Sequence, residues 1–363
     1  MRRTPALILG GGPAGAAAAI GLARAGMPHL LIERTCETGD ALCGGFLSWR
    51  SLDRLATLGI EGDQLNPARL TEARLFARGR VARARLPRPA VAVSRRRLDT
   101  LLMDRALGAG AAVERGVQAR EVAGTSIRTA DGAIVEADTL FLASGKHDVR
   151  GAARPADARG DDPTLGLRLR LAPAPGLTRL VGDAIELHLF HGGYAGLALQ
   201  EDGSANLCMA VHRSRLKAAG DAPALLETLG RELPALADRL VYADFAAPID
   251  AVANVPYGWR TDRAKDGQVR LGDQAACIPS LAGEGMGIAL ASGMGATSAY
   301  LRGGPEALPR WQRDFARSVA PPMRVAGALR SVAESAAAPL LLPAARAPLV
   351  RLLARLTRVP LPA

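Results

Sequence analysis

The chain has 363 residues, and its composition excludes several classes of protein before any motif is considered. Hydrophobic residues make up 48% of it, enough to offset chain entropy, which argues against disorder. The net charge of +11 comes from Arg scattered along the chain, since only three of the 46 basic residues are Lys. That pattern does not predict a nucleic-acid-binding surface. No run reaches the roughly 20 uninterrupted apolar residues of a membrane span.

The four cysteines predict neither a disulfide framework nor a metal site. Cys36, Cys43, Cys208 and Cys277 lie far apart, with no CxxC pair and no His/Cys spacing typical of zinc. We therefore expect a reduced, metal-free protein in the cytoplasm. The N-terminal apolar run ends in a glycine-rich turn without a small-residue cleavage site, which is not typical of a secretory signal.

The elements in chain order predict an α/β fold built on a doubly wound parallel sheet. Residues 5–9 and 29–34 are expected buried strands, and the glycine-rich turn and small-residue helix between them complete a βαβ unit. Residues 95–107 predict a second helix, followed by a short strand. Residues 117–137 alternate around an Asp-Gly turn and predict a small antiparallel meander, after which residues 139–145 form a further parallel strand.

The composition then changes to Pro-rich turns and alternating strands, which predict an inserted antiparallel sheet with one helical stretch near residues 221–239. The helical tail from residue 306 is expected to break at Pro321-Pro322. We expect a discontinuous nucleotide-binding domain, a substrate domain and a C-terminal helical segment. Their boundaries are 1–69, 94–150 and 268–305 for the first, 70–93 and 151–267 for the second, and 306–363 for the third.

The strongest motif is Gly10-x-Gly12-x-x-Gly15, with Glu33 at the end of the next strand. The first glycine permits the tight turn, the second lets the backbone approach a pyrophosphate, and the third lets the helix pack against the strand. The helix N-terminus adds free N–H groups, and the acid can accept hydrogen bonds from ribose hydroxyls. The motif predicts a dinucleotide site but does not separate FAD from NAD.

A second glycine motif makes that distinction. LGDQAACIPSLAGEGMGIAL, from Leu271 onward, resembles the late motif of the para-hydroxybenzoate hydroxylase and geranylgeranyl reductase superfamily of FAD enzymes. The resemblance implies that Asp273 binds the ribityl chain of FAD and that Pro279 lies near the flavin ring. It also implies that the glycine turn opens a helix aimed at the ring, where bare N–H groups stabilise the reduced flavin's charge.

Two further segments extend the resemblance. VSRRRLDTLLMDRALGAGA resembles the segment in which an Arg at a helix start contacts FAD, which implies that role for Arg95; a solvated Arg is the alternative. ALCGGFLSWRSLDRLATLGI resembles the Cys-Gly-Gly loop of the geranylgeranyl reductase branch, which passes beside the flavin ring. Cys43, Gly44 and Gly45 are therefore site candidates, with Cys43 either a catalytic acid or an unreactive loop residue.

The sequence also departs from the family. Ser144 stands where hydroxylases of the superfamily carry an Asp that helps position the flavin and the pyridine nucleotide, so NADPH or NADH is a candidate electron donor whose use is in doubt. Reductases acting on prenyl chains carry a Tyr-x-Trp-x-Phe-Pro element, of which only Tyr194 survives. The resemblance therefore does not imply a geranylgeranyl substrate.

Other polar residues are weaker candidates. His188 and His191 lie on opposite faces of an expected strand, and either could be a general acid or base or simply a solvent-facing or backbone-bonded residue. Glu284, in the glycine turn, is a further catalytic candidate, and the resemblance adds Tyr194 and Pro279. Arg351, Arg355 and Arg358 lie opposite leucines on the last helix, which either contacts an anionic membrane surface or covers the protein's own core.

These observations predict an FAD-dependent oxidoreductase. A monooxygenase acting on an apolar or aromatic substrate is favoured, an oxygen-independent reductase of a C=C bond is the alternative, and an FAD module with a protein-tethered substrate or an electron-transfer role is the third reading. The expected partners are a small substrate, free or carrier-tethered, and no nucleic acid. The residues expected to bind FAD are Gly10, Gly12, Pro13, Ala14, Gly15, Glu33, Arg34, Gly44, Gly45, Arg95, Ser144, Gly145, Gly272, Asp273, Gly283, Gly285, Met286 and Gly287.

Overall fold

The N-terminal strand lies inside a mixed seven-stranded sheet. The structure, a computed structural model, describes residues 2–245, 247–264, 267–343 and 347–359. The strands of this sheet are β1 (Arg2–Leu9), β2 (His29–Glu33), β6 (Ala112–Arg115), β7 (Ala119–Ala123), β8 (Ser126–Thr129), β9 (Ile134–Leu142) and β15 (Gln268–Arg270). Their order is β6-β2-β1-β9-β8-β7, with β15 also on β9. Strands β6, β2, β1, β9 and β15 run parallel, and β7 and β8 form the expected antiparallel meander.

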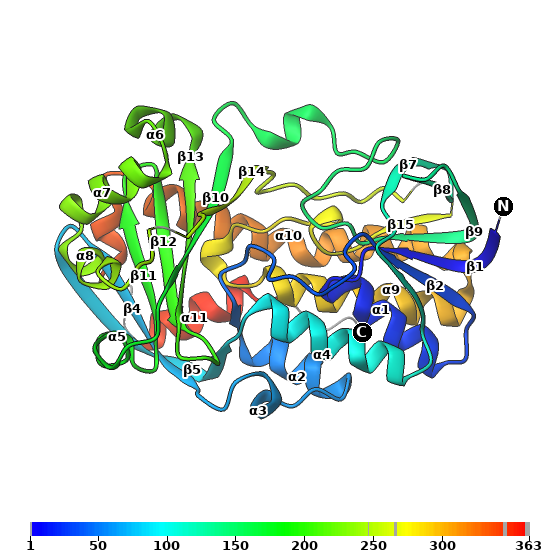
Figure 1. Cartoon of the computed structure of the whole chain (residues 1–363), viewed down its shortest axis with the longest axis horizontal. Coiled ribbons are helices and arrows are strands. Elements are labelled where there is room, and N and C mark those ends of the chain that lie inside the picture. The colour runs from blue at the N-terminus through cyan, green and yellow to red at the C-terminus, as the bar shows by residue number, and fades with distance from the viewer. Residues whose placement is uncertain (1, 246, 265–266, 344–346, 360–363) are drawn as a thin grey trace.

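Helices cover one face of this sheet and the meander packs on the other (Figure 1). The helices are α1 (Pro13–Arg24), α2 (Trp49–Thr57), α3 (Gly62–Leu65), α4 (Arg95–Gly108) and α9 (Gly285–Gly303). The small residues of α1 allow close packing, because the consecutive residues Ala16–Ala19 are fully buried against the sheet and α9. The architecture confirms the nucleotide-binding α/β fold expected from the first 35 residues.

The second sheet collects strands from two distant parts of the chain. They are β3 (Phe46–Leu47), β4 (Leu70–Ala77), β5 (Arg80–Ala92), β10 (Thr164–Leu171), β11 (Ala184–Phe190), β12 (Gly193–Leu199), β13 (Ala205–His212) and β14 (Asp250–Val255). The order is β14-β10-β13-β12-β11-β4-β5-β3, and all neighbours are antiparallel except β4 and β11. This is the expected second sheet, with strands from both segments; the domain boundaries themselves stay a prediction.

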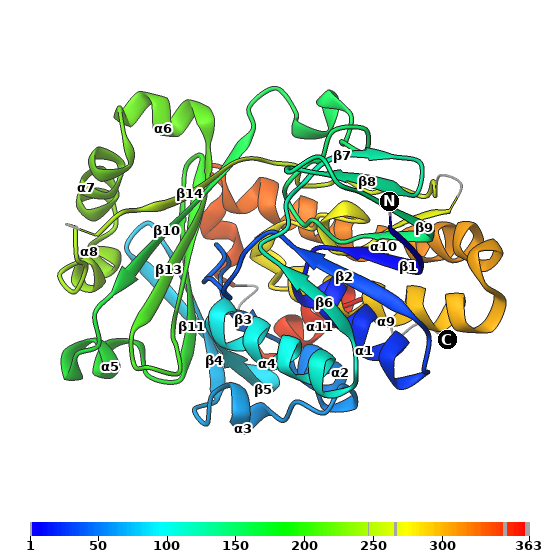
Figure 2. The same cartoon turned by 45° about the vertical axis from the view of Figure 1, so that its right-hand side comes forward.

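Four helices cover the outer face of the second sheet, as Figures 1 and 2 show from two directions. They are α5 (Pro175–Val181), α6 (Arg213–Ala219), α7 (Ala222–Glu232) and α8 (Pro234–Leu240). Because side chains alternate along a strand, Leu167, Leu169 and Leu207 pack into this helical layer. The intervening residues, such as Arg168 and Asn206, point to the inner face, toward the first sheet.

The C-terminal segment runs past both sheets as α10 (Leu308–Ala333), the short 3-10 helix η5 (Ala338–Leu341) and α11 (Ala347–Thr357). The prediction that the helix breaks at Pro321-Pro322 is wrong, because α10 continues through both prolines. Phe315, Val319, Met323 and Ala326 keep one continuous apolar face buried on both sides of them, and this packing outweighs the lost backbone hydrogen bonds.

The last helix buries one side and exposes leucines on the other. α11 contacts β5 and α10, and the side chain of Arg358, just after it, is buried. Leu352 and Leu356 are 49% and 45% exposed. α11 therefore covers the core with only part of its apolar surface, and some of its leucines remain exposed. Within the described part of the chain, no helix combines the length and apolar character needed to cross a membrane.

Candidate functional site

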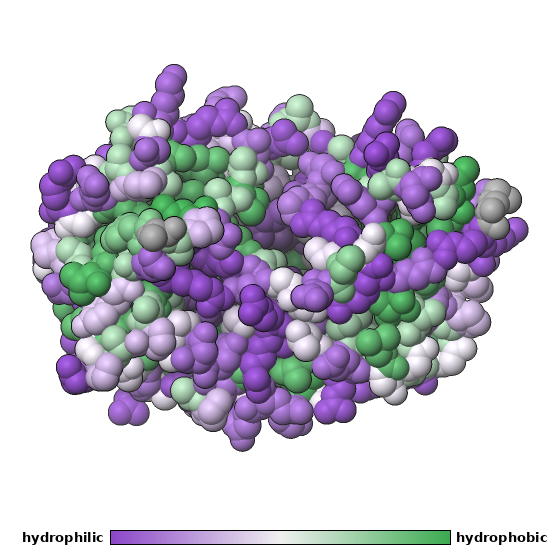
Figure 3. All heavy atoms as spheres, viewed as in Figure 1, coloured by the Kyte–Doolittle hydropathy of each residue, from purple (hydrophilic) through white to green (hydrophobic). Residues whose placement is uncertain are grey.

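A cavity of about 620 Å³ lies between the two sheets and is lined by both glycine motifs. Figure 3 shows the surface hollowed near its centre, between the parts of the molecule built on each sheet. The cavity runs along the carboxyl ends of β1, β2 and β9, where ligands of open α/β sheets bind. The predicted residues that line it are Gly10, Gly12, Pro13, Ala14, Glu33, Arg34, Cys43, Gly44, Gly45, Arg95, Ser144, Gly145, Gly272, Asp273, Gly283, Gly285 and Met286.

The first glycine turn has the geometry of a pyrophosphate cradle. Gly10 has a φ of +109°, which favours glycine, and the backbone then turns into α1 at Pro13. A Cβ on Gly15 would lie 1.9 Å from the Gly10 carbonyl oxygen, so only glycine allows α1 to pack this close to the turn. Glu33 accepts a hydrogen bond from the Gly11 N–H at 2.7 Å, which places its carboxylate beside the turn. The donors and the acid fit the phosphate and ribose ends of a dinucleotide.

The second glycine motif presents a helix N-terminus to the same cavity. Gly283, with φ of +62°, turns the chain into α9, which begins at Gly285 and has no acidic residue in its first turn. A Cβ on Gly285 would meet no atom within 4 Å, so the backbone there is open to a ligand. Free N–H groups with the positive end of the helix dipole suit the electron-rich edge of a reduced flavin.

Lys146 is a residue of this site that the sequence analysis missed. Its Nζ lies 3.0 Å from Oδ2 of Asp273, and the charge of Asp273 raises the pKa of Lys146 above its ordinary value. Lys146 therefore stays charged and holds the carboxylate expected to meet the ribityl chain. Lys146 directly follows Ser144-Gly145, where the sequence departs from the family motif. That position in the sequence could have marked it as a candidate site residue.

Arg95 lies at the start of α4 with its guanidinium beside the first glycine turn. A Cβ on Gly12 would lie 3.4 Å from its Nη2, and its other contacts are two hydrogen bonds to Asp99 at 2.8 and 2.6 Å. Ser94 caps α4 by accepting from the Arg97 N–H, which fixes the helix start. The ion pair holds a positive charge where a pyrophosphate fits, so the placement agrees with the role expected from the resemblance.

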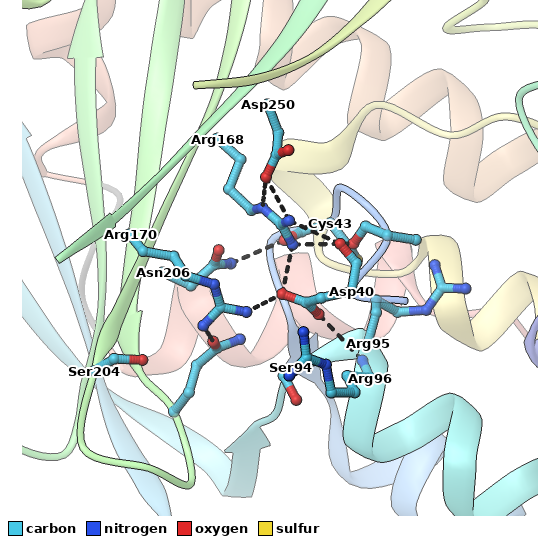
Figure 4. A network of polar contacts seen from close by, with 12 residues as sticks. Asp40, Cys43, Ser94, Arg95, Arg96, Arg168, Arg170, Ser204, Asn206 and Asp250 are labelled. Carbon is cyan, nitrogen blue, oxygen red and sulfur yellow. Dashed lines mark hydrogen bonds and ion pairs between the residues drawn. The ribbon is translucent and has the colours of Figure 1, made fainter. Parts of the chain in front are cut away.

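The Cys43 loop is held to the inner face of the second sheet by a buried ionic network (Figure 4). Asp40 pairs with Arg168 at 2.7 Å and also with Arg170, and the Asp40 and Arg168 side chains are each 7% exposed. Asp250 pairs with the other side of the Arg168 guanidinium at 2.5 Å. Asn206 donates to the Cys43 carbonyl at 2.8 Å. β10 and β13 therefore position the loop that lines the cavity; the signal in the sequence was the alternation of Arg168 and Arg170 with leucines.

We expect Arg168→Ala to loosen the Cys43 loop, because it removes one partner of a buried ion pair. The thiol of Cys43 should then react with a disulfide reagent roughly ten- to hundredfold faster than in the parent, the opening expected when hydrogen bonds worth about 1.5–3 kcal/mol are lost. The measurement uses a Cys36→Ser, Cys208→Ser background, since Cys36 is exposed and Cys208 lines the same cavity as Cys43.

Arg213→Ala, which removes an exposed Arg whose side chain bonds Asn254, is the matched control and should leave the labelling rate unchanged. Equal labelling rates in the Arg168 variant and the control would show that the network does not hold the loop.

The structure places His188 and His191, two of the predicted catalytic residues, outside the cavity, which corrects those expectations. His188 is fully buried in the second sheet, stacked on Phe76 and 3.2 Å from Glu186, which Arg239 of α8 also binds. His191 is exposed in the β11–β12 turn. The alternation of side chains along a strand separates its two faces, but it does not tell which face is turned to the cavity. In β11, the face with Glu186 and His188 packs against the outer helices.

Glu284 is also turned away from the cavity. Its carboxylate is fully buried at 3.2 Å from Nε of Arg358 and 3.8 Å from Nη1 of Arg54, and Ser48 donates to it. Glu284 therefore links the C-terminal segment to the start of α9, and it does not line the cavity. Pro279 and Gly287 do not line the cavity either: Pro279 is buried between two residues that do, Ile278 and Ser280, and Gly287 packs on Glu284. Tyr194 is buried but is bonded to Ser280, which does line it.

The comparison with known families agrees with the site. Residues 3–152 match the family described as the FAD binding domain. The resemblance of the motifs to the para-hydroxybenzoate hydroxylase and geranylgeranyl reductase superfamily agrees with this domain match and with a sequence relationship to a geranylgeranylglycerophospholipid reductase. The expected FAD-binding domain and fold are therefore confirmed, whereas the roles of the individual site residues stay predictions.

The similar proteins include reductases and also PqsL, which is described as a probable FAD-dependent monooxygenase. The chain is 29% identical over 316 residues to digeranylgeranylglycerophospholipid reductase 2 of Methanopyrus kandleri, covering 79% of this chain and 74% of that protein. It is similar in fold to PqsL of P. aeruginosa, solved in complex with 2-aminobenzoylacetate, with a TM-score of 0.73, 18% identity and coverage of 92% and 97%. A geranylgeranyl bacteriochlorophyll reductase-like protein of Thermoplasma acidophilum has a TM-score of 0.70, 21% identity and coverage of 99% and 94%.

Proposed function

We propose that this FAD-dependent oxidoreductase is a monooxygenase that acts on a compact apolar or aromatic substrate. The observation that carries the proposal is the end of the cavity on the side of the second sheet, which we call the apolar end. It is lined by Phe46, Cys208, Val252, Val255, Tyr257 and Ile278. Walls of this kind suit an apolar or aromatic substrate, and the loss of the Tyr-x-Trp-x-Phe-Pro element, of which only Tyr194 survives, argues against a long prenyl chain.

The residues of the chain have separable roles in this proposal. Bound FAD supplies the redox chemistry, and the protein orients it and controls access of water. The first glycine turn and Arg95 hold the pyrophosphate, Glu33 the ribose, and Asp273 with Lys146 the chain between phosphate and ring. The N-terminus of α9 stabilises negative charge on the ring, and the apolar end keeps water from the reacting atoms.

A reductase of an activated or isolated C=C bond is the second candidate, and Cys43 is the observation that favours it. The thiol-bearing loop lines the cavity and is held by Asn206 and the Asp40 network, so its sulfur has a defined place near the expected ring position. A thiol there could supply the proton that a reduced alkene requires. The sequence relationship to an archaeal lipid reductase agrees with this candidate.

The two candidates differ in their response to oxygen. The FAD-loaded protein is reduced anaerobically and then mixed with dissolved oxygen in a stopped-flow spectrophotometer. A monooxygenase is expected to show a transient absorption before the oxidised-flavin spectrum returns. Immediate single-phase return of that spectrum would contradict the monooxygenase and favour the reductase.

Two further proposals concern the electron donor and the partners. NADH and NADPH are candidate donors, and anaerobic reduction by each measures their use; failure of both would support Ser144 as a lost nicotinamide-handling feature. The substrate is proposed to be free or tethered to a carrier or protein. A peripheral contact of α11 with an anionic membrane is the other proposed interaction. Exposed Leu352 and Leu356 beside Arg351 and Arg355 support the membrane contact.

A further inference from the structure

Three hydroxyl groups from distant segments meet at the apolar end of the cavity. Tyr194 lies on β12, Tyr257 follows β14, and Ser280 begins the short 3-10 helix η3 (Ser280–Ala282) before α9. The Tyr194 hydroxyl is 2.5 Å from Oγ of Ser280, and the Tyr257 hydroxyl donates to the same Oγ at 2.7 Å. The backbone N–H of Leu281 donates to the Tyr194 hydroxyl at 2.9 Å. We call Tyr194, Tyr257 and Ser280 the hydroxyl cluster.

The directions of these hydrogen bonds follow from counting donors. Tyr194 is 3% exposed, and among the described residues its hydroxyl has no partner besides the Leu281 N–H and Ser280. If Ser280 donated to Tyr194, the Tyr194 hydrogen would be buried without an acceptor, which costs about 1–3 kcal/mol. Tyr194 therefore donates to Ser280, as Tyr257 does. Burial raises the pKa of both tyrosines, so both keep the hydrogen that this arrangement needs.

This count leaves one hydrogen on Ser280. Its Oγ accepts two hydrogen bonds, which uses the acceptor capacity of a hydroxyl. Ser280 is exposed and lines the cavity, and no described residue accepts from it. The remaining O–H is therefore directed to a group inside the cavity. Such a donor, fixed by its neighbours before any ligand arrives, loses little entropy when it binds.

The cluster is braced from outside the cavity. The guanidinium of Arg330 on α10 lies 4.8 Å from the centre of the Tyr257 ring and pairs with Glu334 at 2.7 Å. It also donates to Oγ1 of Thr164 at 2.5 Å. Tyr257 is thus held by a cation–π contact whose cation is itself fixed, which keeps the direction of its hydroxyl.

We propose that the cavity takes an aromatic substrate whose ring bears a hydrogen-bond-accepting oxygen, and that the Ser280 hydroxyl donates to that oxygen. This rests on the proposed function, because it places the substrate at the apolar end. In that otherwise apolar region, a single fixed donor orients a flat substrate by one oxygen.

The test uses FAD-loaded protein with oxidised flavin and two probes of the same shape. 2-Acetylnaphthalene carries a carbonyl oxygen, and 2-isopropenylnaphthalene replaces that oxygen with a methylene group. Binding is followed by the change in flavin absorbance. We expect the ketone to bind about tenfold more tightly than the hydrocarbon, the difference typical of one hydrogen bond.

Variants of Ser280 test whether its hydroxyl causes the difference in affinity between the two probes. Ser280→Ala should remove the preference for the ketone while leaving hydrocarbon affinity unchanged, and Ser280→Thr, which keeps a hydroxyl, should retain it. Ser331→Ala, an exposed Ser→Ala change whose hydroxyl bonds Gly327 within α10, is the control and should behave as the parent. Equal affinities in the parent, a preference that survives Ser280→Ala, or failure of both probes to bind would each overturn the proposal. The titration involves no reaction with oxygen, so its failure is distinct from failure of the monooxygenase proposal.

Discussion

Gly15→Ala is expected to yield a protein that is purified nearly colourless. The added Cβ would lie 1.9 Å from the Gly10 carbonyl oxygen, so α1 must move away from the turn. Gly15 does not have a positive φ, so the substitution introduces a contact and no backbone strain. Displacing the start of α1 moves the N–H groups expected to bind the pyrophosphate, and we expect FAD affinity to fall at least roughly tenfold, with about 1–3 kcal/mol of stability lost to overpacking.

The measurement is the ratio of flavin to protein absorbance, followed by titration of the apoprotein with FAD. Gly108→Ala is the matched control, since a Cβ there meets no atom within 4 Å and Gly108 does not have a positive φ. We expect it to bind FAD as the parent does. A Gly15→Ala protein with full flavin content would contradict the role of this turn, and a parent that refuses FAD would contradict the function itself.

Glu284→Ala is expected to lower the free energy of unfolding by about 3–5 kcal/mol, because it leaves two buried guanidinium groups without their shared carboxylate. Arg54 and Arg358 are 2% and 7% exposed, and neither can be hydrated without opening the contact between α2, α9 and the C-terminal segment. Urea unfolding followed by circular dichroism measures the change. Limited proteolysis should also show earlier cleavage near Arg358.

A surface ion pair provides the comparison for this variant. Glu232 pairs with Arg215 at 2.6 Å, and its side chain is 43% exposed. Exposed pairs contribute about 0–1 kcal/mol, so Glu232→Ala should change the unfolding free energy by no more than that. Similar losses in the two variants would mean that the Glu284 cluster does not join the C-terminal segment to the site.

The candidate cofactor site was predictable because its signals are local. Gly10, Gly12 and Gly15 form one turn, and Glu33 ends the next strand, so the spacing alone places all four together in a βαβ unit. The Gly272–Gly287 segment is likewise one continuous turn and helix start. Here a residue's neighbours in sequence are also its neighbours in space, and pattern recognition is sufficient.

The candidate catalytic residues were not predictable in the same way. Strand alternation separated the face of His188 from that of His191, but the choice between cavity and outer helices depends on what packs on each side of β11. The predicted helix break at Pro321-Pro322 was wrong for a related reason. Burial of Phe315, Val319 and Met323 outweighs the local helix-breaking preference of the prolines.

The nucleotide-binding fold and the two glycine motifs at the cofactor cavity can be read from the chain, because backbone geometry and helix termini specify them within short segments. Which polar side chains face that cavity depends instead on the packing of distant segments. Asp40 meets Arg168 across 128 residues, and Tyr194, Tyr257 and Ser280 come from three separate segments. Contacts of this kind depend on how the two sheets pack, and no local pattern in the chain records that packing.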